Sequence, residues 1–184
     1  MILNKNDLKL FLKSELYRNG FSSYGDYLVK FIYGNDNARA VRYLRTLRNY
    51  EYYINTNHFF LKHLLRYRFR RLSLRYNISI KPNTVDHGLW IPHTQGGIII
   101  NCEKMGCNCT VTSGVVVGDK GPATNVATIG NNVELTLGCK VLGKITIGDN
   151  VIVAPNSVVV KDVPSNAVVS GVPAILIKLN GEKC

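Results

Sequence analysis

A six-residue period runs through the second part of the chain and constrains its fold more than any other feature. Large apolar residues recur at this spacing, and a small residue often follows them. Hexapeptide repeats are typical of a parallel β-helix, in which three hexapeptides form one triangular coil with an apolar interior. Coils stabilise one another by stacking. The repeated residues are Ile99, Met105, Val111 and Val117, followed by Ile129, Leu135, Val141, Ile147, Val153 and Val159.

The residues between these apolar positions predict the corners of each coil. Gly130-Asn131-Asn132 and Gly148-Asp149-Asn150 supply the residue types that tight turns need. Residues 118–127 lack the pattern, so we expect them to form a loop that leaves the coil. A second small or β-branched residue lies four positions after many of the apolar ones, as at Cys109, Val133, Cys139, Val151 and Ser157.

Residues 1–76 have a different period. Leu61, Leu65, Leu72 and Tyr76 fall on one helical face, and a second amphipathic stretch lies between breaks at residues 34–35 and 55–57. We therefore predict a mainly β protein with two parts. Residues 1–76 form an α-helical N-terminal region, and residues 77–184 form the β-helix.

Charge divides the chain at the same place. Residues 1–76 hold fifteen Lys and Arg against five Asp and Glu, whereas residues 77–184 hold eight against seven and contain no Arg. The Arg-rich stretch 66–75 is interpreted first as a solvated helix face that packs against neighbours. Peripheral association with an anionic membrane surface or a lipid-linked glycan is the second interpretation. Nucleic acid is not expected, because the aromatic residues fit no recognised binding motif.

The cysteines and the N-terminal residues indicate in which cellular compartment the protein is expected. Five cysteines, an odd count, argue against a disulfide framework, and residues 1–16 have the charge spacing of an amphipathic helix rather than a secretory segment. A cytoplasmic protein is expected. Cys107 and Cys109 are spaced C-x-C without the partners of a zinc site, so we predict core-filling cysteines and no metal.

Five motifs stand out in the second part of the chain, namely Ile91 to Ile98, Ile129 to Val133, Lys140 to Gly143, Ile147 to Asn150 and Val169 to Ala174. Together they resemble the hexapeptide acyltransferases, specifically their serine acetyltransferase branch. The resemblance covers about residues 78–177. Within it, Gly88-Leu89-Trp90-Ile91-Pro92-His93 is similar to the pattern of capsule and exopolysaccharide O-acetyltransferases.

The resemblance implies a left-handed β-helix, a homotrimer or a multiple of it, and acetyl-CoA as co-substrate. It implies that His93 is a general base, which takes the proton of an acceptor hydroxyl as the oxygen attacks the thioester. His93 is six residues before Ile99, so the repeat alone would point it inward. Coenzyme A is expected in a groove between subunits, in contact with Gly118, Asp119, Leu137, Pro155, Lys161, Gly171 and Pro173.

The acceptor is the least constrained part of the prediction. Pro92, Asn125 and Val126 stand where the serine enzymes carry the charged residues that hold the amino acid. We therefore expect a sugar hydroxyl of a surface polysaccharide or its precursor, with serine as the alternative and a non-catalytic assembly module as a third hypothesis. One interpretation of His87 is that it orients the catalytic residue or contacts the substrate. Trp90 either stacks on a sugar or caps the open end of the coils.

Overall fold

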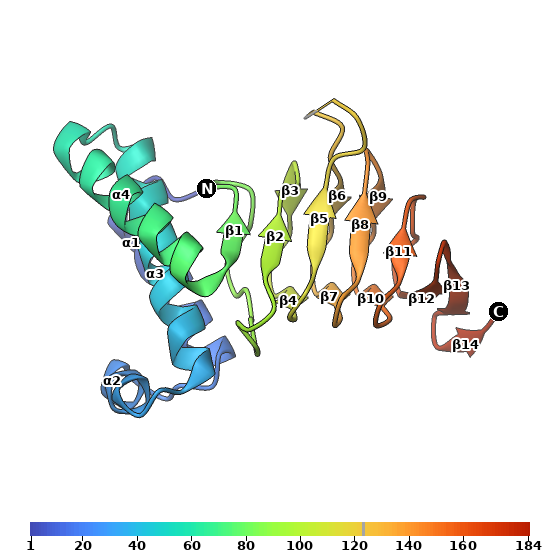
Figure 1. The fold of residues 1–184 in the computed structure, drawn as a ribbon, viewed down its shortest axis with the longest axis horizontal. Helices are drawn as coiled ribbons and strands as arrows, with labels where there is room; N and C mark the ends of the chain where they lie inside the picture. The colour runs from blue at the N-terminus through green and yellow to red at the C-terminus, as the bar shows by residue number, and fades with distance from the viewer. Residues whose placement is uncertain (123) are drawn as a thin grey trace.

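The computed structural model describes residues 1–122 and 124–184 and contains a helical region followed by a triangular prism (Figure 1). Three of the four helices start with a side chain that caps the first turn, and the last helix, after His58, does not. Asn4 and Asp7 form a reciprocal capping box at the first helix, and Asn35 caps the third. The helices are α1 (Lys5–Arg18), α2 (Tyr24–Ile32), α3 (Asp36–Asn55) and α4 (Phe59–Tyr76). Among the described residues, no helix is long and apolar enough to cross a bilayer.

The prism has three faces, each a sheet of short parallel strands. The first face contains β1 (Ile78–Ile80), β2 (Ile98–Ile100), β5 (Val116–Gly118), β8 (Lys140–Leu142) and β11 (Val158–Val159). The second contains β3 (Lys104–Met105), β6 (Thr128–Ile129) and β9 (Thr146–Ile147). The third contains β4 (Thr110–Val111), β7 (Glu134–Leu135), β10 (Ile152–Val153) and β12 (Ala167–Gly171), and antiparallel strands β13 (Ala174–Leu179) and β14 (Glu182–Lys183) extend it. The predicted left-handed β-helix is confirmed.

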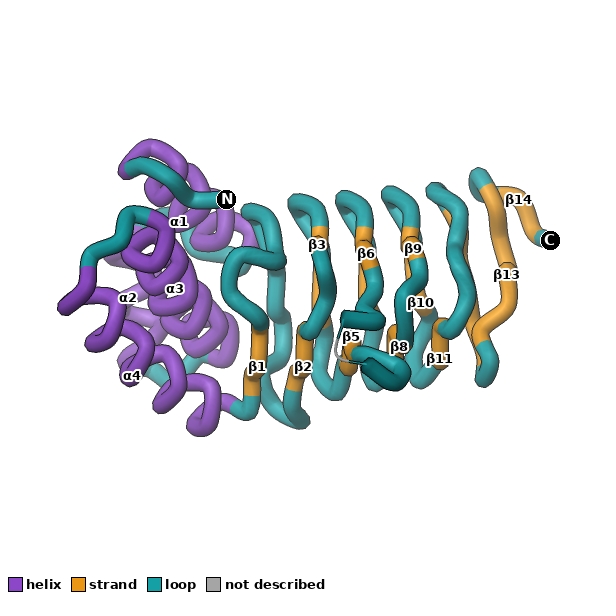
Figure 2. Tube along the Cα trace, turned by 90° about the horizontal axis from the view of Figure 1, so that it is seen from above, coloured by secondary structure: helices purple, strands orange, loops and turns teal. Residues whose placement is uncertain are grey.

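Strand register shows how the interrupting loop is accommodated. Ile129 pairs with Ile147 and Leu135 with Val153, which is a coil of 18 residues. Met105 pairs with Ile129, so the coil that contains residues 118–127 is 24 residues long. The additional residues leave the prism after β5, and the described part of the loop lies outside the stacked strands (Figures 1 and 2). The six-residue repeat therefore has the same phase before and after the loop, because 24 is also a multiple of six.

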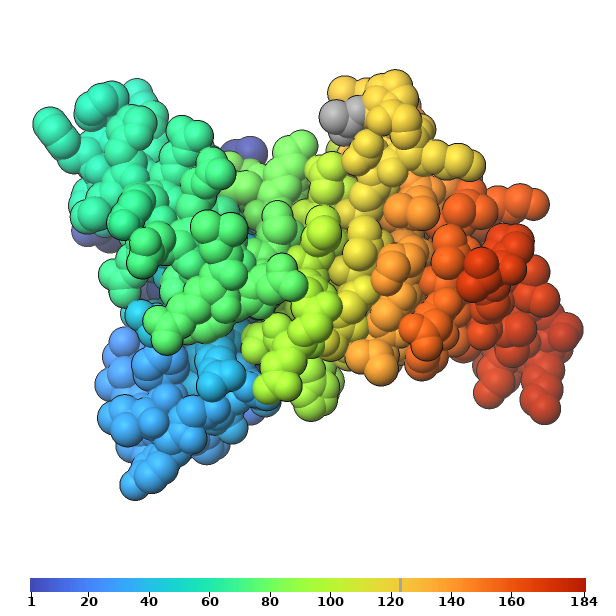
Figure 3. Space-filling model, in the orientation of Figure 1, coloured from blue at the N-terminus to red at the C-terminus, as the bar shows by residue number. Residues whose placement is uncertain are grey.

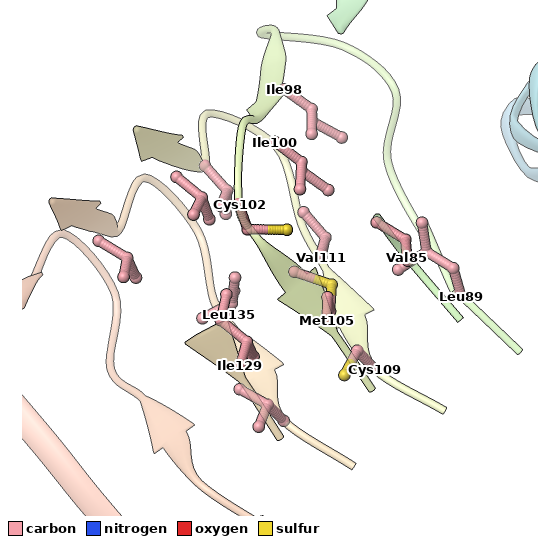
Figure 4. Close-up of a cluster of buried hydrophobic side chains, with 14 of the residues drawn as sticks. Val85, Leu89, Ile98, Ile100, Cys102, Met105, Cys109, Val111, Ile129 and Leu135 are labelled. Carbon is pink, nitrogen blue, oxygen red and sulfur yellow. The ribbon is translucent and has the colours of Figure 1, made fainter. Parts of the chain in front are cut away.

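The interior follows the predicted repeat except in the first coils. Met105, Val111 and Leu135 are fully buried and point into the prism (Figure 4). Ile99 was expected to do the same, but 48% of its surface is exposed, and its neighbours Ile98 and Ile100 are buried instead. The reason is coil length, because Ile100 pairs with Val117 at a spacing of 17 residues rather than 18.

Asparagines in the left-handed conformation stack at one corner of the prism. Asn132 Nδ2 donates to Asn150 Oδ1 at 3.1 Å, and Asn150 Nδ2 donates to Asn166 Oδ1 at 2.8 Å. All three residues have φ between 55° and 59°, which Asn tolerates better than most residues. The asparagine side chains of successive coils therefore form hydrogen bonds with one another along the axis of the prism.

Helices α3 and α4 close the first end of the prism. Leu44, Leu47 and Phe69 belong to the same buried cluster as the residues of the coils. The indole of Trp90 does not fill this end, because Trp90 lies on the third face between the inward-pointing Leu89 and Ile91. The interpretation of Trp90 as a cap is therefore wrong.

Candidate active site

His93 lies at a corner of the prism and is exposed. It follows Trp90, which pairs with Thr110 on the third face, and precedes β2 on the first face. The six-residue repeat, extended back from Ile99, predicts that the imidazole points into the prism, and this prediction is wrong. The reason is that the first coils have irregular lengths, so the repeat marks interior positions only from Met105 onward. Gly96 and Gly97, with φ of 99° and 79°, complete the turn. An exposed imidazole can exchange protons with a bound ligand.

The turns that link the third face to the first are hydrogen-bonded into a column, which we call the His93 corner. Gly114 N donates to Gly97 O at 2.7 Å, and Gly138 N donates to Ser113 O at 2.9 Å. The column continues through later coils, and Gly171 N donates to Ser157 Oγ at 3.1 Å. Four of the residues expected to contact coenzyme A lie on or beside this corner and are exposed, namely Leu137, Pro155, Gly171 and Pro173.

Gly118, Asp119 and Lys161 lie at another corner, where the first face turns into the second. Gly143 N donates to Gly118 O at 3.1 Å, and Lys161 follows β11 as Gly143 follows β8. We call this column the loop corner, because residues 118–127 leave the prism from it. The first face separates it from the His93 corner. Within one chain, the expected coenzyme A residues therefore form two separate groups.

The structure does not bring His87 to His93. His87 lies at the corner between the second and third faces, where its carbonyl accepts from Asn108 N at 2.9 Å and its ring meets Phe11 of α1 edge-on at 5.7 Å. Trp90 lies on the third face three residues before His93. Neither His87 Nδ1 nor Trp90 Nε1, both buried, has a hydrogen-bond partner among the described residues.

Asn125 and Val126 stand where the serine enzymes carry charged residues, and here they belong to the loop after β5. Asn125 Nδ2 donates to Lys120 O at 2.6 Å, and its Oδ1 accepts from Lys144 N at 3.1 Å. Val126 is buried. Because the Asn125 amide is already engaged and Val126 is apolar, neither residue supplies a charge for an acceptor.

A small recess beside the His93 turn was not predicted from the sequence. It has a volume of about 230 Å³ and is lined by Arg39, Arg75, Thr94 and Gln95, with Tyr76, Asn77 and Gly96. Asp36 Oδ1 accepts from Arg39 Nη1 at 3.1 Å, and Asp36 Oδ2 accepts from Gln95 Nε2 at 2.9 Å. Two guanidinium groups and one carboxylate leave the recess with net positive charge.

Cys109 fills the core as predicted, but Cys107, predicted to do the same, is only half-buried, and its Sγ donates to Asn131 Oδ1 at 3.3 Å. Cys102, Cys109 and Cys139 are buried, and burial raises the pKa of their thiols to about 11, 11 and 12. Such thiols are protonated and unreactive at neutral pH. Among residues 1–122 and 124–184, no group of three or more His, Cys, Asp or Glu is arranged to hold a metal ion.

The known proteins that this chain resembles share one name. No protein-family model matches the chain. A serine acetyltransferase of Staphylococcus xylosus is 38% identical over 109 residues, which cover 58% of this chain and 50% of the relative. A serine acetyltransferase from Brucella abortus strain S19, in complex with coenzyme A, has a TM-score of 0.68 at 25% identity and covers 97% of this chain and 68% of its own.

A third comparison agrees in fold. Serine acetyltransferase from Neisseria gonorrhoeae, in complex with serine, has a TM-score of 0.66 at 23% identity and covers 94% of this chain and 68% of its own. The chain spans about half the length of the curated relatives it matches. These proteins carry the name serine acetyltransferase, so the expected closeness to capsule and exopolysaccharide enzymes is not supported.

Proposed function

We propose that the chain is an acetyl-CoA-dependent O-acetyltransferase in which His93 is the general base. The observation that carries the proposal is the exposed His93 on a corner it shares with Leu137, Pro155 and Gly171. The likeness to acetyltransferases solved with coenzyme A and with serine supports it. The corner also offers a ligand close approach to the backbone, because several of its turns are built from Gly.

The reaction follows from the chemistry of the two partners. An aliphatic hydroxyl is far too weak an acid to ionise at neutral pH, so a base must accept its proton at the moment of attack. His93 takes the proton while the hydroxyl oxygen bonds to the thioester carbonyl carbon. The carbon–sulfur bond then breaks, and the leaving thiolate receives the proton from the imidazolium. The acetyl group is thereby transferred to the acceptor oxygen without a covalent intermediate on the protein.

For the acceptor, the comparisons favour serine over a polysaccharide hydroxyl. Serine has a carboxylate, and Arg is the residue best suited to bind one. Residues 77–184 contain no Arg. The recess beside the His93 turn supplies two, Arg39 and Arg75, from the helical region. In our proposal, this recess holds the acceptor carboxylate.

A sugar hydroxyl is the second candidate acceptor. Pro92, Asn125 and Val126 provide no charge for a zwitterion, and a sugar needs none. In that case Arg39 and Arg75 would be dispensable for turnover. The two acceptors therefore make opposite predictions for the same variants.

Release of free thiol from acetyl-CoA tests the activity and the acceptor together. We expect serine to accelerate release, and His93→Ala to slow it by roughly 10²–10⁴-fold, the usual contribution of general acid–base catalysis. His87→Ala is the matched control, because that imidazole lies at another corner. A folded His93→Ala protein with wild-type turnover would contradict the assignment of the base.

Variants of the recess separate the two acceptors. Arg75→Gln and Arg39→Gln should raise the KM for serine and leave the KM for acetyl-CoA nearly unchanged. Arg66→Gln, on the exposed surface of α4, is the control for loss of one positive charge. Turnover of a glycan panel, with no response to serine at any concentration, would establish the sugar acceptor instead. Absence of turnover with every acceptor would favour a binding module.

A further inference from the structure

Helix α4 has two different long faces. One face packs against the rest of the molecule through Leu65, Phe69, Leu72 and Tyr76, which are spaced by three or four residues. Tyr50 of α3 stacks on Phe69, with ring centroids 5.6 Å apart. This face joins α4 to the common core. The opposite face points away from the protein, and α4 forms the front of the molecule at the helical end (Figures 1 and 3).

The outward face is apolar where a solvated helix would be polar. Phe60, Leu64, Tyr67 and Leu74 expose 85%, 62%, 64% and 82% of their surfaces. Together with Arg71 they follow the spacing i, i+4, i+7, i+11 and i+14, which places all five on one stripe. The stripe lies on the side of the helix opposite Phe69. We call it the outer stripe of α4.

Cations border the outer stripe on both sides. With 100° of rotation per residue, Arg68 flanks one side and Arg66 and Arg70 the other, while Arg75, further along the helix from Arg68, lines the recess beside the His93 turn. The sequence contains no Asp or Glu from residue 52 to residue 85. None of the ion pairs found among the described residues includes a cation of α4. The face therefore combines exposed apolar side chains with a dense positive charge that has no internal compensation.

We propose that the outer stripe of α4 binds the surface of an anionic lipid membrane, with the helix lying in the plane of the interface. Apolar side chains on one stripe enter the boundary between headgroups and acyl chains, and the flanking Arg side chains reach the lipid phosphates. A second copy of the chain fits this face less well, because residues 1–76 hold fifteen Lys and Arg against five Asp and Glu, so the helical region of another copy would bring further positive charge to the Arg side chains. The charge instead complements phosphate.

Co-sedimentation with lipid vesicles tests the proposal on the full-length protein. We expect binding to vesicles of phosphatidylcholine that contain about one third phosphatidylglycerol, and little binding to phosphatidylcholine alone. Each cation near an anionic surface changes partitioning about fivefold, so Arg68→Gln with Arg71→Gln should weaken binding by about 30-fold. High salt should weaken it further, because it screens the surface charge.

The apolar contribution needs its own variants. Leu64→Ser with Leu74→Ser should reduce binding to anionic vesicles at least tenfold. Leu10→Ser with Ile175→Ser is the matched control, because both residues are exposed apolar side chains on other elements. Circular dichroism and thermal unfolding check that each variant is folded. All four changes are at exposed positions, so we expect native folds.

Three results would overturn the proposal. The first is no binding of the wild-type protein to anionic vesicles at low salt. The second is equal binding of the outer-stripe variants and the control. The third is a fall in chain number, measured by light scattering, when Leu64 and Leu74 are replaced, which would assign the stripe to a contact between copies. None of these measurements depends on the proposed acetyl transfer.

Discussion

At the scale of single residues, one buried ion cluster connects the helices to the first coil. Arg48 is fully buried and donates from Nη2 to Glu15 Oε1 at 2.6 Å and from Nη1 to Glu51 Oε2 at 2.9 Å. The same guanidinium donates to the carbonyl oxygens of Val85 at 2.8 Å and Asp86 at 2.9 Å. Two carboxylates thus share one cation, and Glu15 Oε2 has no hydrogen-bond partner within the part of the chain that the structure describes.

This arrangement predicts an unusual pH dependence of stability. Burial raises the pKa of Glu15 to about 7, from an ordinary value near 4.5. Between these values the unfolded chain releases a proton that the folded protein retains, so the contribution of Glu15 to the free energy of unfolding falls as pH rises from about 4.5 to 7. We expect Glu15→Gln to remove this fall. Denaturant unfolding at several pH values measures it.

The control for this prediction is Glu103→Gln, a change at an exposed carboxyl group. It should leave the wild-type pH profile intact. Parallel pH profiles for wild type and Glu15→Gln would show that Glu15 keeps an ordinary pKa in the folded protein.

The candidate site was only partly predictable at this scale. His93 could be assigned by resemblance because its motif is contiguous, from Gly88 onward. The recess could not, because Arg39 and Arg75 come from two helices that no local pattern links to residues 94–96. The direction of the His93 side chain was also missed, since one residue fewer in a coil turns an inward position outward.

At the scale of elements, the corner between the second and third faces depends on the absence of side chains. A Cβ on Gly130 would lie 2.8 Å from Asp149 N and 2.8 Å from the carbonyl carbon of Gly148. Those atoms belong to the next coil, which Gly130 N also holds through a hydrogen bond to Ile147 O at 2.8 Å. Backbone cannot move aside without breaking the stack.

Gly130→Ala should therefore destabilise the protein by about 1–3 kcal/mol, the usual cost of forcing extra volume into a packed site. Gly25→Ala is the control, because it lies in α2 and its Cβ would meet only the Ser23 hydroxyl, at 3.7 Å. Ala is also the better helix former. Chemical denaturation of both variants gives the difference. Equal stability would mean that the coils separate more easily than their hydrogen bonds suggest.

Element boundaries were predictable wherever the local signals were strong. The breaks at residues 34–35 and 55–57 delimit α3 as predicted. The repeat located the interior positions from Met105 onward, and the loop after β5 was expected. The repeat did not extend to Ile99, because the first coils have irregular lengths and take their shape from the helices that cover them.

At the scale of the whole molecule, the two groups of expected coenzyme A residues cannot meet in one chain. Leu137 and Pro155 lie on the His93 corner, whereas Asp119 and Lys161 lie on the loop corner. A ring of three copies can pair the His93 corner of one copy with the loop corner of the next, because contacts around a ring join two different surfaces. The separation is thus consistent with the homotrimer that the sequence motifs suggest, which remains a prediction.

Light scattering should give a mass of three chains or a multiple of three. Mixed assemblies make the stronger test, because a site built from two copies can be restored by two defective chains. Co-expression of His93→Ala with Lys161→Glu should recover about a quarter of the wild-type activity. An intact site needs the Lys161→Glu chain at the His93 corner and the His93→Ala chain at the loop corner, and random mixing places each there about half of the time. Either variant alone should stay inactive. A fully active monomer would rule out the shared site.

The loop after β5 has a consequence for how such prisms change over time. Its coil is six residues longer than the 18-residue coil that follows it, and six residues equal one side of the triangle. The geometry does not demand this number, because the loop begins and ends at a corner and any length could bulge there. An insertion of six residues leaves the apolar positions on both sides of the loop a multiple of six apart, just as a three-nucleotide insertion preserves a reading frame. Protruding segments can therefore be exchanged at this corner without changing the stacking of the coils beneath them.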